Sequence, residues 1–350
     1  MKHLIYILII VLFTVSCKKD DSEPELNYTG NCSVLTSTSD GGILTKVSTE
    51  QVGIAITKFD EACTKEWENG YSWGKIPMCD HDCGEVSVEK AFEAEDNNYF
   101  LLYSFSYYSS PYSRYFLVKL DHLGNELWNK DIYFEESLFY FNKTDDGFIG
   151  FDTYNELIHF DEYGSLISNS TLTELEDLNI VYRTLSTESN KVIIITKNDT
   201  ISGFEKYEYS LTGNLINTKE YTLDLESLNL KYNPGIVMLL ANEDLILYSL
   251  TYDDKSILLR INKSSDLIWT KEIDEQYYNY IQYQSDNELL LRSSSNILYM
   301  NFEGELLGSK EIVRTDNYFF QNNDFVFQLF LKNGNEYYAT KTPFKEFFSK

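Results

Sequence analysis

The chain has 350 residues, of which 29 are Lys or Arg and 55 are Asp or Glu, so its formal net charge is −26 at pH 7. Nucleic acids and anionic lipid surfaces attract proteins mainly through clustered Lys and Arg side chains. The sequence contains no sustained basic patch. The composition therefore excludes nucleic acid as a partner and argues against binding to anionic lipid headgroups.

The N-terminus has the layout of an export signal. An apolar run extends from Leu4 to Val15, which is too short to span a bilayer. The segment FTVSC that ends at Cys17 resembles the signal of bacterial lipoproteins, in which signal peptidase cuts before the cysteine and the thiol is acylated, for example with palmitate. Thr14 departs from the commonest form, which has Leu there. We therefore expect residues 1–16 to be a signal peptide and Cys17 to carry a lipid.

Residues 17–26 are expected to form an acidic, flexible tether. The segment KKDDSEPE directly after the cysteine is rich in residues that disfavour packing. It resembles the Lys-then-acidic tag by which lipoproteins of the Bacteroidetes group reach the outside of the outer membrane. The predicted partner is thus the outer membrane, with the cell surface as the favoured location and the periplasmic face as the alternative.

Four cysteines lie beyond the predicted lipidation site, at Cys32, Cys63, Cys79 and Cys83. An exported chain is oxidised, and an even number of cysteines favours two disulfides with three possible connectivities. The segment from Cys79 to Cys83, with His81 between them, can also be interpreted as a metal site. Zinc sites usually have a second closely spaced pair, which this chain lacks, so disulfides are the favoured hypothesis.

A short phrase recurs along the rest of the chain: an apolar residue, Asp, Asn or Ser, two residues, Gly or Ser, then apolar residues and often Trp. Five clear copies begin at Leu120, Phe160, Tyr209, Ile261 and Met300, and a degenerate sixth begins at Phe59. Their spacing averages about 48 residues, in the range of four-stranded propeller blades. Runs of apolar and aromatic β-formers between Asn, Asp and Gly support strands. We expect an all-β propeller over residues 27–350 with seven four-stranded blades, six or eight being alternatives.

Within the phrase, Asp, Asn or Ser starts a tight turn by bonding its own backbone, and Gly three residues later tolerates positive φ. The turn is expected to lead into the third strand of each unit. The tryptophan position is occupied by Trp67, Trp128, Ser168, Asn217, Trp269 and Gly308 in the six copies. We expect the tryptophans to be packing residues wedged between neighbouring blades.

The pattern apolar-D-x-x-G-x-L-x-W resembles the repeat of PQQ-type quinoprotein propellers and their non-enzymatic relatives. Quinoprotein dehydrogenases commonly use a vicinal cysteine pair against the cofactor and a calcium site. This chain has no adjacent cysteines, and the turn pairs Asp145-Asp146 and Asp253-Asp254 lack the spacing of a calcium loop. The resemblance therefore implies the non-enzymatic branch, with no cofactor and no metal.

The two ends of the repeat are irregular. The first interval holds a predicted insertion at about residues 68–90. After the last phrase, two strands surround Asn333-Gly334, a strong hairpin signal, and no further phrase follows. We expect the segment from Asn27 to Ser37 to complete the last blade and close the ring, leaving no open sheet edge.

Candidate recognition residues lie in two predicted loops, at Trp73, His81, Tyr107, Tyr108, Tyr112 and Tyr115. Loops on a rigid scaffold tend to carry function, and tyrosine suits both sugar rings and protein interfaces. No nucleophile elbow, HExxH helix or phosphate loop occurs, so no catalytic residue is predicted.

The sequence thus favours an anchored propeller that binds glycan or protein without catalysis. The alternative is a scaffold facing the periplasm, resembling the propeller lipoprotein of the outer-membrane protein assembly machine. A third hypothesis is an enzyme acting on polysaccharide, which requires carboxylates or histidines that converge at the central channel.

Overall fold

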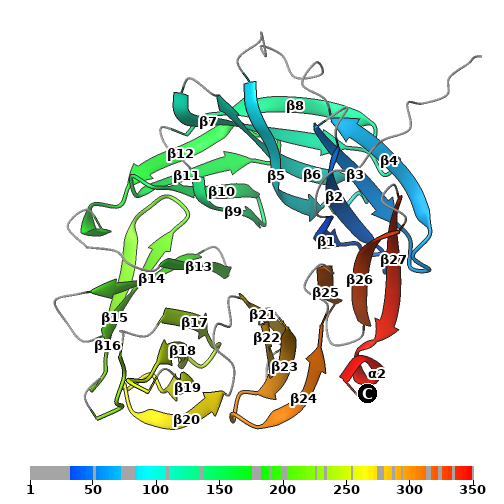
Figure 1. The fold of residues 1–350 in the computed structure, drawn as a ribbon. Coiled ribbons are helices and arrows are strands. Elements are labelled where there is room, and N and C mark those ends of the chain that lie inside the picture. The colour runs from blue at the N-terminus through cyan, green and yellow to red at the C-terminus, as the bar shows by residue number, and fades with distance from the viewer. Residues whose placement is uncertain are drawn as a thin grey trace, which may run out of the picture.

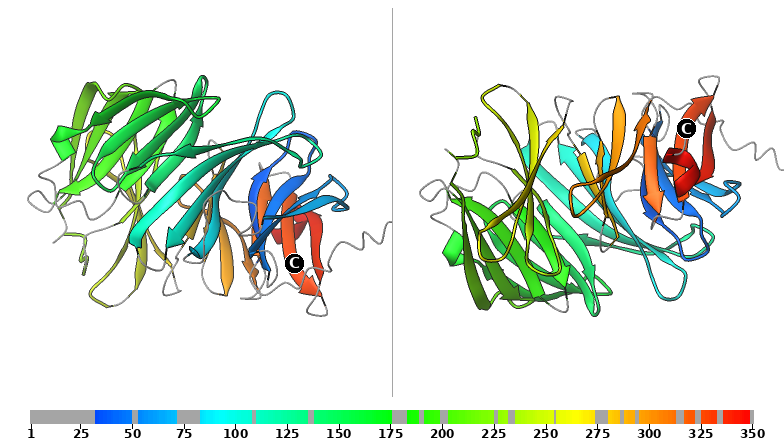
Figure 2. Two further views of the ribbon diagram at one scale, coloured as in Figure 1. Left: turned by 90° about the horizontal axis from the view of Figure 1, so that it is seen from above. Right: turned by 90° about the horizontal axis from the view of Figure 1, so that it is seen from below.

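A computed structural model describes residues 32–49, 53–71, 83–107, 110–134, 138–175, 183–188, 191–198, 203–224, 227–231, 235–253, 255–273, 280–285, 288–292, 295–312, 317–321, 325–332 and 336–348. These residues form seven antiparallel sheets arranged in a ring (Figure 1), six with four strands and one with three. We call each sheet a blade and number the blades in chain order. The predicted all-β propeller is confirmed. The side views in Figure 2 show twisted sheets standing next to one another around the ring.

Consecutive strands are neighbours in every blade. Blades 1 to 3 contain β1 (Ser33–Ser37), β2 (Ile43–Thr49), β3 (Gly53–Phe59), β4 (Lys65–Tyr71), β5 (Cys83–Glu93), β6 (Tyr99–Tyr107), β7 (Ser110–Leu120), β8 (Glu126–Ile132), β9 (Leu138–Thr144), β10 (Gly147–Asp152), β11 (Glu156–Asp161) and β12 (Leu166–Thr171), followed by the 3-10 turn η2 (Thr173–Leu175). Blades 4 and 5 contain β13 (Arg183–Glu188), β14 (Lys191–Asn198), β15 (Gly203–Ser210), β16 (Leu215–Thr222), β17 (Gly235–Leu239), β18 (Leu245–Leu250), β19 (Ser256–Ile261) and β20 (Leu267–Ile273). Blades 6 and 7 contain β21 (Tyr280–Ser285), β22 (Glu288–Arg292), β23 (Asn296–Asn301), β24 (Leu306–Glu311), β25 (Asn317–Gln321), β26 (Phe325–Lys332) and β27 (Glu336–Pro343), before the helix α2 (Phe344–Phe348).

The repeated phrase forms the hairpin between the third and fourth strands of a blade. The strand that follows it is therefore the fourth and outermost strand, and not the third as the sequence indicated. The predicted turn chemistry is confirmed: Asp121 Oδ1 accepts hydrogen bonds from the backbone N–H groups of Leu123 and Asn125 at 2.9 and 2.8 Å. The glycine position has positive φ in all six copies, at Cys63, Gly124, Gly164, Gly213, Ser265 and Gly304.

The hydrophobic core lies between blades, because each blade packs both faces against its neighbours. Between blades 2 and 3, for example, Phe100 and Leu117 pack against Phe148 and Phe160. The tryptophans act as the predicted wedges. Trp67 Nε1 in blade 1 donates a hydrogen bond to the backbone oxygen of a blade 2 turn residue, His122, at 3.0 Å. Where the phrase of blade 6 has Gly308, the ring of Phe348 from α2 packs against the vacant position.

The ring closes by side-chain packing between blades 1 and 7, which lie next to each other in Figure 1. Ser33–Ser37 pairs with β2 inside blade 1, and blade 7 has only β25, β26 and β27 among the described residues. These five residues therefore do not complete the last blade as expected, because a tight turn from Thr38 to Gly42 pairs them with the strand that follows. Residues 27–31 of the expected closing segment lie outside the described residues. Lys341 Nζ of blade 7 lies 3.4 Å from Glu61 Oε1 of blade 1.

Parts of the sequence predictions fall on residues that are not described. These are Cys17, Trp73, Cys79, His81 and Tyr108. Of the predicted insertion, residues 68–71 belong to β4 and residues 83–90 to β5. Cys32 is buried, Cys63 is half-buried, and both are present as thiols. No helix in the described ranges is long and apolar enough to cross a membrane.

Candidate functional site

The hairpins that join strands 1 to 2 and strands 3 to 4 lie at the same end of each blade, and we call this side of the ring the turn face. In several blades a basic side chain on this face binds a carboxylate of the same blade. The basic residue lies two positions before the first turn residue of the phrase, and the carboxylate lies in the first hairpin, which joins strands 1 and 2. We call this pair the clasp. Among the described residues four blades have one, formed by Lys58 and Asp40 (2.8 Å), Lys119 and Asp96 (3.0 Å), His159 and Asp146 (3.1 Å), and Arg260 and Asp244 (2.7 Å).

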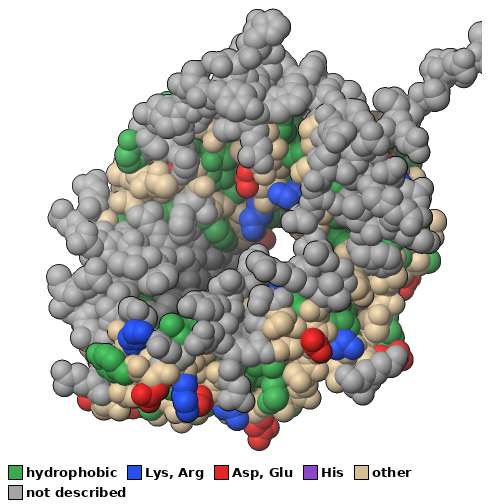
Figure 3. All heavy atoms as spheres, in the orientation of Figure 1, with side chains coloured by type: hydrophobic (Ala, Val, Ile, Leu, Met, Phe, Trp, Pro, Cys, Tyr) green, Lys and Arg blue, Asp and Glu red, His purple; other side chains and the backbone are tan. Residues whose placement is uncertain are grey.

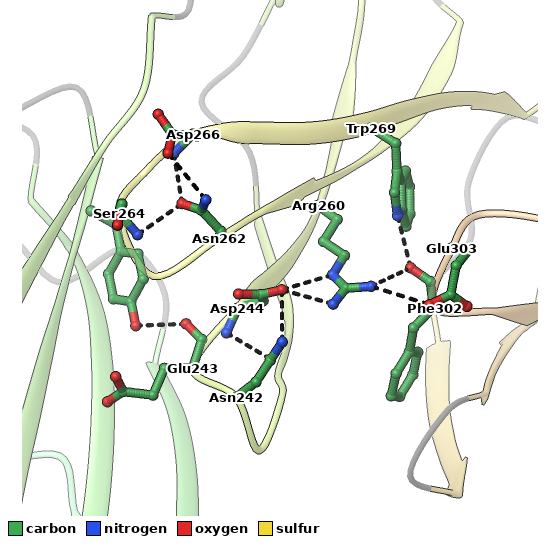
Figure 4. A network of polar contacts seen from close by, with 11 residues as sticks. Asn242, Glu243, Asp244, Arg260, Asn262, Ser264, Asp266, Trp269, Phe302 and Glu303 are labelled. Atoms are coloured by element: carbon green, nitrogen blue, oxygen red, sulfur yellow. Dashed lines mark hydrogen bonds and ion pairs between the residues drawn. The ribbon is translucent and has the colours of Figure 1, made fainter.

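The clasp of blade 5 also connects to blade 6 (Figure 4). Arg260 Nε and Nη2 donate to Asp244 Oδ2 at 3.0 and 2.7 Å, and Nη1 donates to the backbone oxygen of Phe302 at 2.9 Å. Trp269 Nε1 donates to the same oxygen at 2.7 Å. Because charged hydrogen bonds in a buried setting are strong, this network holds the turn of blade 6 against blade 5.

Blade 4 reverses the charge at the clasp position. Glu208 stands there, and the buried ammonium of Lys206 binds it at 2.7 Å and also binds Glu243 of blade 5. Lys219 Nζ adds a second contact to Glu243 at 3.0 Å. The hydrogen bonds from Lys206 and Lys219 hold the pKa of Glu243 at about 2. The reversed pair therefore joins blades 4 and 5, and Lys191 at the first hairpin of blade 4 adds a contact to Glu208 at 3.8 Å.

A pocket of about 560 Å³ opens between blades 2 and 3 on the turn face. The first hairpin of blade 2 and both turn-face hairpins of blade 3 contribute to its wall. The charged lining residues are Glu95, Asp96, Lys119, Lys143, Asp145, Asp146, Asp161 and Glu162. Carboxylates thus outnumber ammonium groups by six to two in this lining. A cleft lined mainly by one sign of charge focuses the field and concentrates ions of the opposite sign.

The clasp of blade 2 forms part of the pocket wall. Lys119 Nζ binds Asp96 at 3.0 Å and lies 5.1 Å from the centre of the Phe100 ring. Burial raises the pKa of Asp96, but the hydrogen bonds from Lys119 and Asn98 outweigh it and hold this pKa below its ordinary value. In the described part of the chain no Lys or Arg forms an ion pair with Glu95 or Asp145, both of which are exposed. These two carboxylates are therefore available to an incoming cation.

The structure places Tyr115 in the interior rather than in an exposed loop. Its side chain is 6% exposed, its hydroxyl accepts a hydrogen bond from the Leu138 N–H at 2.8 Å, and its ring packs edge-on against Phe134. Tyr107 and Tyr112 belong to β6 and β7, so the segment expected to be a loop is largely a β-hairpin. Tyr115 therefore contributes to packing at the junction of blades 2 and 3.

Sequence reasoning missed the pocket, although it noted the turn Asp145-Asp146. The available signal was the basic residue before four of the six phrases, in KFD, KLD, HFD and RIN, at Lys58, Lys119, His159 and Arg260. Its carboxylate partners lie 13 to 23 residues earlier.

Figure 3 shows that charged side chains of both signs also occur beside the centre of the ring. Within the described ranges no group of three or more His, Cys, Asp or Glu is arranged to hold a metal ion.

The seven-sheeted ring defines the chain as a β-propeller. No family model and no curated protein matches the sequence. The chain is similar in structure to BamB from Moraxella catarrhalis, with 10% identity, coverage of 91% of this chain and 85% of that chain, and a TM-score of 0.44. It is also similar to BBS1N, solved in complex with ARL6DN, with 10% identity, 90% and 92% coverage and a TM-score of 0.49. A protein of unknown function from Bacteroides caccae has 14% identity, 70% and 82% coverage and a TM-score of 0.38. Likenesses at these levels transfer no activity or partner.

Proposed function

We propose that the protein is a lipid-anchored interaction module outside the cytoplasm, which binds a cationic segment of a partner protein without catalysis. The observation that carries this proposal is the acidic pocket between blades 2 and 3. Lys and Arg side chains make strong, charge-assisted hydrogen bonds to carboxylates. A pocket whose rim has exposed carboxylates that pair with no Lys or Arg of the described ranges is therefore suited to such a segment.

The same pocket is less suited to a glycan. Sugar rings stack on exposed aromatic faces, but Phe100 and Phe148 of the lining are only 3% and 0% exposed. Tyr163 is the one exposed aromatic residue among the lining residues, at 61%. The rim therefore provides several carboxylates that can bind a Lys or Arg side chain, but only one exposed aromatic ring on which a sugar could stack.

The anchor in this proposal is a lipid on Cys17. Its support is the FTVSC signal and the KKDDSEPE tag, which favours the cell surface over the periplasmic face. Cells that express the chain should incorporate labelled palmitate into it, and Cys17→Ser should abolish the label. Protease added to intact cells should digest the protein. An unlabelled wild-type chain would contradict the anchor, and complete protection from protease would place the protein on the periplasmic face.

Neutralising the pocket should weaken the binding of a cationic peptide. A fluorescent octalysine peptide is the probe, and the mature chain carries Cys17→Ser so that it stays in solution. Each carboxylate near a bound ammonium contributes on the order of 1 kcal/mol at a solvated surface. Glu95→Gln combined with Asp145→Asn is therefore expected to raise the dissociation constant about tenfold or more, measured by fluorescence anisotropy at low salt.

The matched control is Glu220→Gln combined with Asp253→Asn, two exposed carboxylates in other blades. It changes the net charge by the same amount and should alter the dissociation constant less than about twofold, because distant exposed charges are screened. Equal weakening by the two double variants would show that octalysine senses only overall charge. That result would contradict the pocket as the binding site.

A further inference from the structure

Blade 3 departs from the other clasps at two positions that lie side by side. His159 stands where blades 1, 2 and 5 have Lys or Arg. Ser168 stands where the phrase has Trp in three other copies. The two residues are direct cross-strand partners in β11 and β12. Side chains of such partners project from the same face of a sheet, so the two departures form one local environment.

This environment lies on the face of blade 3 that packs against blade 4, since His159 alternates with Ile158 and Phe160 of the blade 2 side. It reaches the pocket through Asp146. His159 is 3% exposed, and its Nε2 lies 3.1 Å from Oδ1 of Asp146, a pocket-lining residue that is 59% exposed in its side chain. His159 Nδ1 and Ser168 Oγ are both buried and have no hydrogen-bond partner among the described residues. His159 thus lies between Ser168 on the neighbouring strand and Asp146 of the pocket wall.

Serine suits this position in both charge states of the imidazole. A hydroxyl can donate a hydrogen bond to Nδ1 of a neutral imidazole and can accept one from the N–H of an imidazolium. The indole that stands here in other copies is a donor only, and it could not accept from an imidazolium. The structure has no hydrogen bond between the two atoms, so Ser168 is compatible with either charge state of the imidazole without fixing one.

Histidine is the one side chain whose ordinary pKa lies between 5 and 8, whereas Lys and Arg stay charged throughout that range. Apart from Lys143 in the pocket lining and Lys130, which binds Ser165 of the same hairpin, the other titratable groups around His159 are carboxylates and phenols. They are Asp145, Asp146, Asp161 and Glu162 of its own blade, Tyr207 and Tyr209 on the face of blade 4 that packs against blade 3, and Glu174 and Glu205 beside those phenols. Burial raises the pKa of Tyr207 to about 12 and that of Tyr209 further. The phenols therefore remain neutral between pH 5.5 and 8.

We infer that His159 makes the acidic pocket a pH-sensitive binding site: its protonation neutralises Asp146 at the pocket wall and weakens the hold on a cationic segment. The inference rests on the proposed function, because it concerns the same pocket. With a neutral imidazole, Asp146 contributes its full charge to the pocket. With a protonated imidazole, His159 and Asp146 form an ion pair like those of blades 1 and 2, and one negative charge of the pocket is lost to the ligand.

The test compares the affinity for octalysine at pH 8.0 and pH 5.5 at constant ionic strength, with the mature chain carrying Cys17→Ser. The peptide keeps its charge over this range. One unit charge at the pocket wall corresponds to a three- to tenfold change in the dissociation constant, to order of magnitude. We expect wild type to bind about three- to tenfold more weakly at pH 5.5.

Two substitutions at His159 test whether the charge of its imidazole causes the pH dependence: one is always neutral and the other is always charged. His159→Gln should bind as wild type does at pH 8.0 and should lose the pH dependence. His159→Lys reproduces the clasps of blades 1 and 2 and should bind weakly at both pH values. Should either variant fail to fold, as judged by its thermal unfolding, Asp146→Asn serves instead and should bind weakly and independently of pH.

The inference is overturned if His159→Gln or Asp146→Asn keeps the pH dependence of wild type. It is also overturned if wild type binds octalysine equally at both pH values, and in that case the proposed function stands as long as Glu95→Gln with Asp145→Asn still weakens binding. Failure of folded wild type to bind octalysine at either pH overturns the proposed function and the inference together.

Discussion

Arg260→Met is expected to lower the free energy of unfolding by about 3–5 kcal/mol, the usual cost of removing one partner of a buried ion pair. The side chain of Asp244 is only 6% exposed and would lose both hydrogen bonds from the guanidinium. The backbone oxygen of Phe302 would lose one of its two side-chain donors. Chemical denaturation followed by circular dichroism measures the loss.

The matched control lies in the same blade. Lys255 forms an ion pair with Glu272 at 2.5 Å, and the two side chains are 54% and 50% exposed. Solvent-exposed pairs contribute about 0–1 kcal/mol, so Lys255→Met should leave stability nearly unchanged. An equal loss in the two variants would mean that the burial of the blade 5 clasp has no energetic consequence, contrary to the role assigned to it.

Gly124→Ala is expected to cost about 2–4 kcal/mol, because it combines left-handed backbone strain with overpacking. Gly124 has φ +82°, and a Cβ atom there would lie 2.5 Å from Asn69 Nδ2 and 2.7 Å from Trp67 Cε3. Both neighbours belong to the outer strand of blade 1, which holds the turn in place. Thermal or chemical unfolding of the variant measures the cost.

Gly164→Ala isolates the steric part of this effect. Gly164 has φ +72°, but a Cβ atom there would meet no atom closer than 3.3 Å, and that atom belongs to the flexible Lys130 side chain. Only the backbone cost of about 1–2 kcal/mol is expected. If Gly124→Ala proved no more damaging than Gly164→Ala, Trp67 would not be a wedge between blades.

The blade architecture could be predicted because its determinants are local. Asp121 bonds N–H groups two and four residues away, and Gly124 needs a backbone conformation that other residues rarely adopt. Such constraints act within five residues and repeat in the six blades that contain the phrase. The alternation of apolar residues then places the strands, and Trp at a fixed distance from the turn indicates the contact with the next blade.

The remaining features depend on register and on distant partners. Lys119 and Asp96 are 23 residues apart and meet only because β5, β6 and β7 pair in one particular alignment. The expectation for Ser33–Ser37 failed because two pairings were compatible with its composition, and the local hairpin with β2 formed. Tyr115 looked like a loop residue beside Ser and Pro, but β7 extends through that segment. Composition alone does not decide with which strand Ser33–Ser37 pairs or whether Tyr115 lies in a loop or a strand.

Amide hydrogen exchange of the mature chain with and without octalysine tests most directly whether the pocket between blades 2 and 3 is the binding site. We predict slower exchange in the presence of the peptide at residues 94–98 and 143–147, the hairpins that bear Glu95 and Asp145. The turn-face hairpins of blades 5 and 6 should be unchanged and serve as the internal reference. Peptide-dependent slowing confined to other blades, or bound peptide with no slowing at either hairpin, would contradict the assignment.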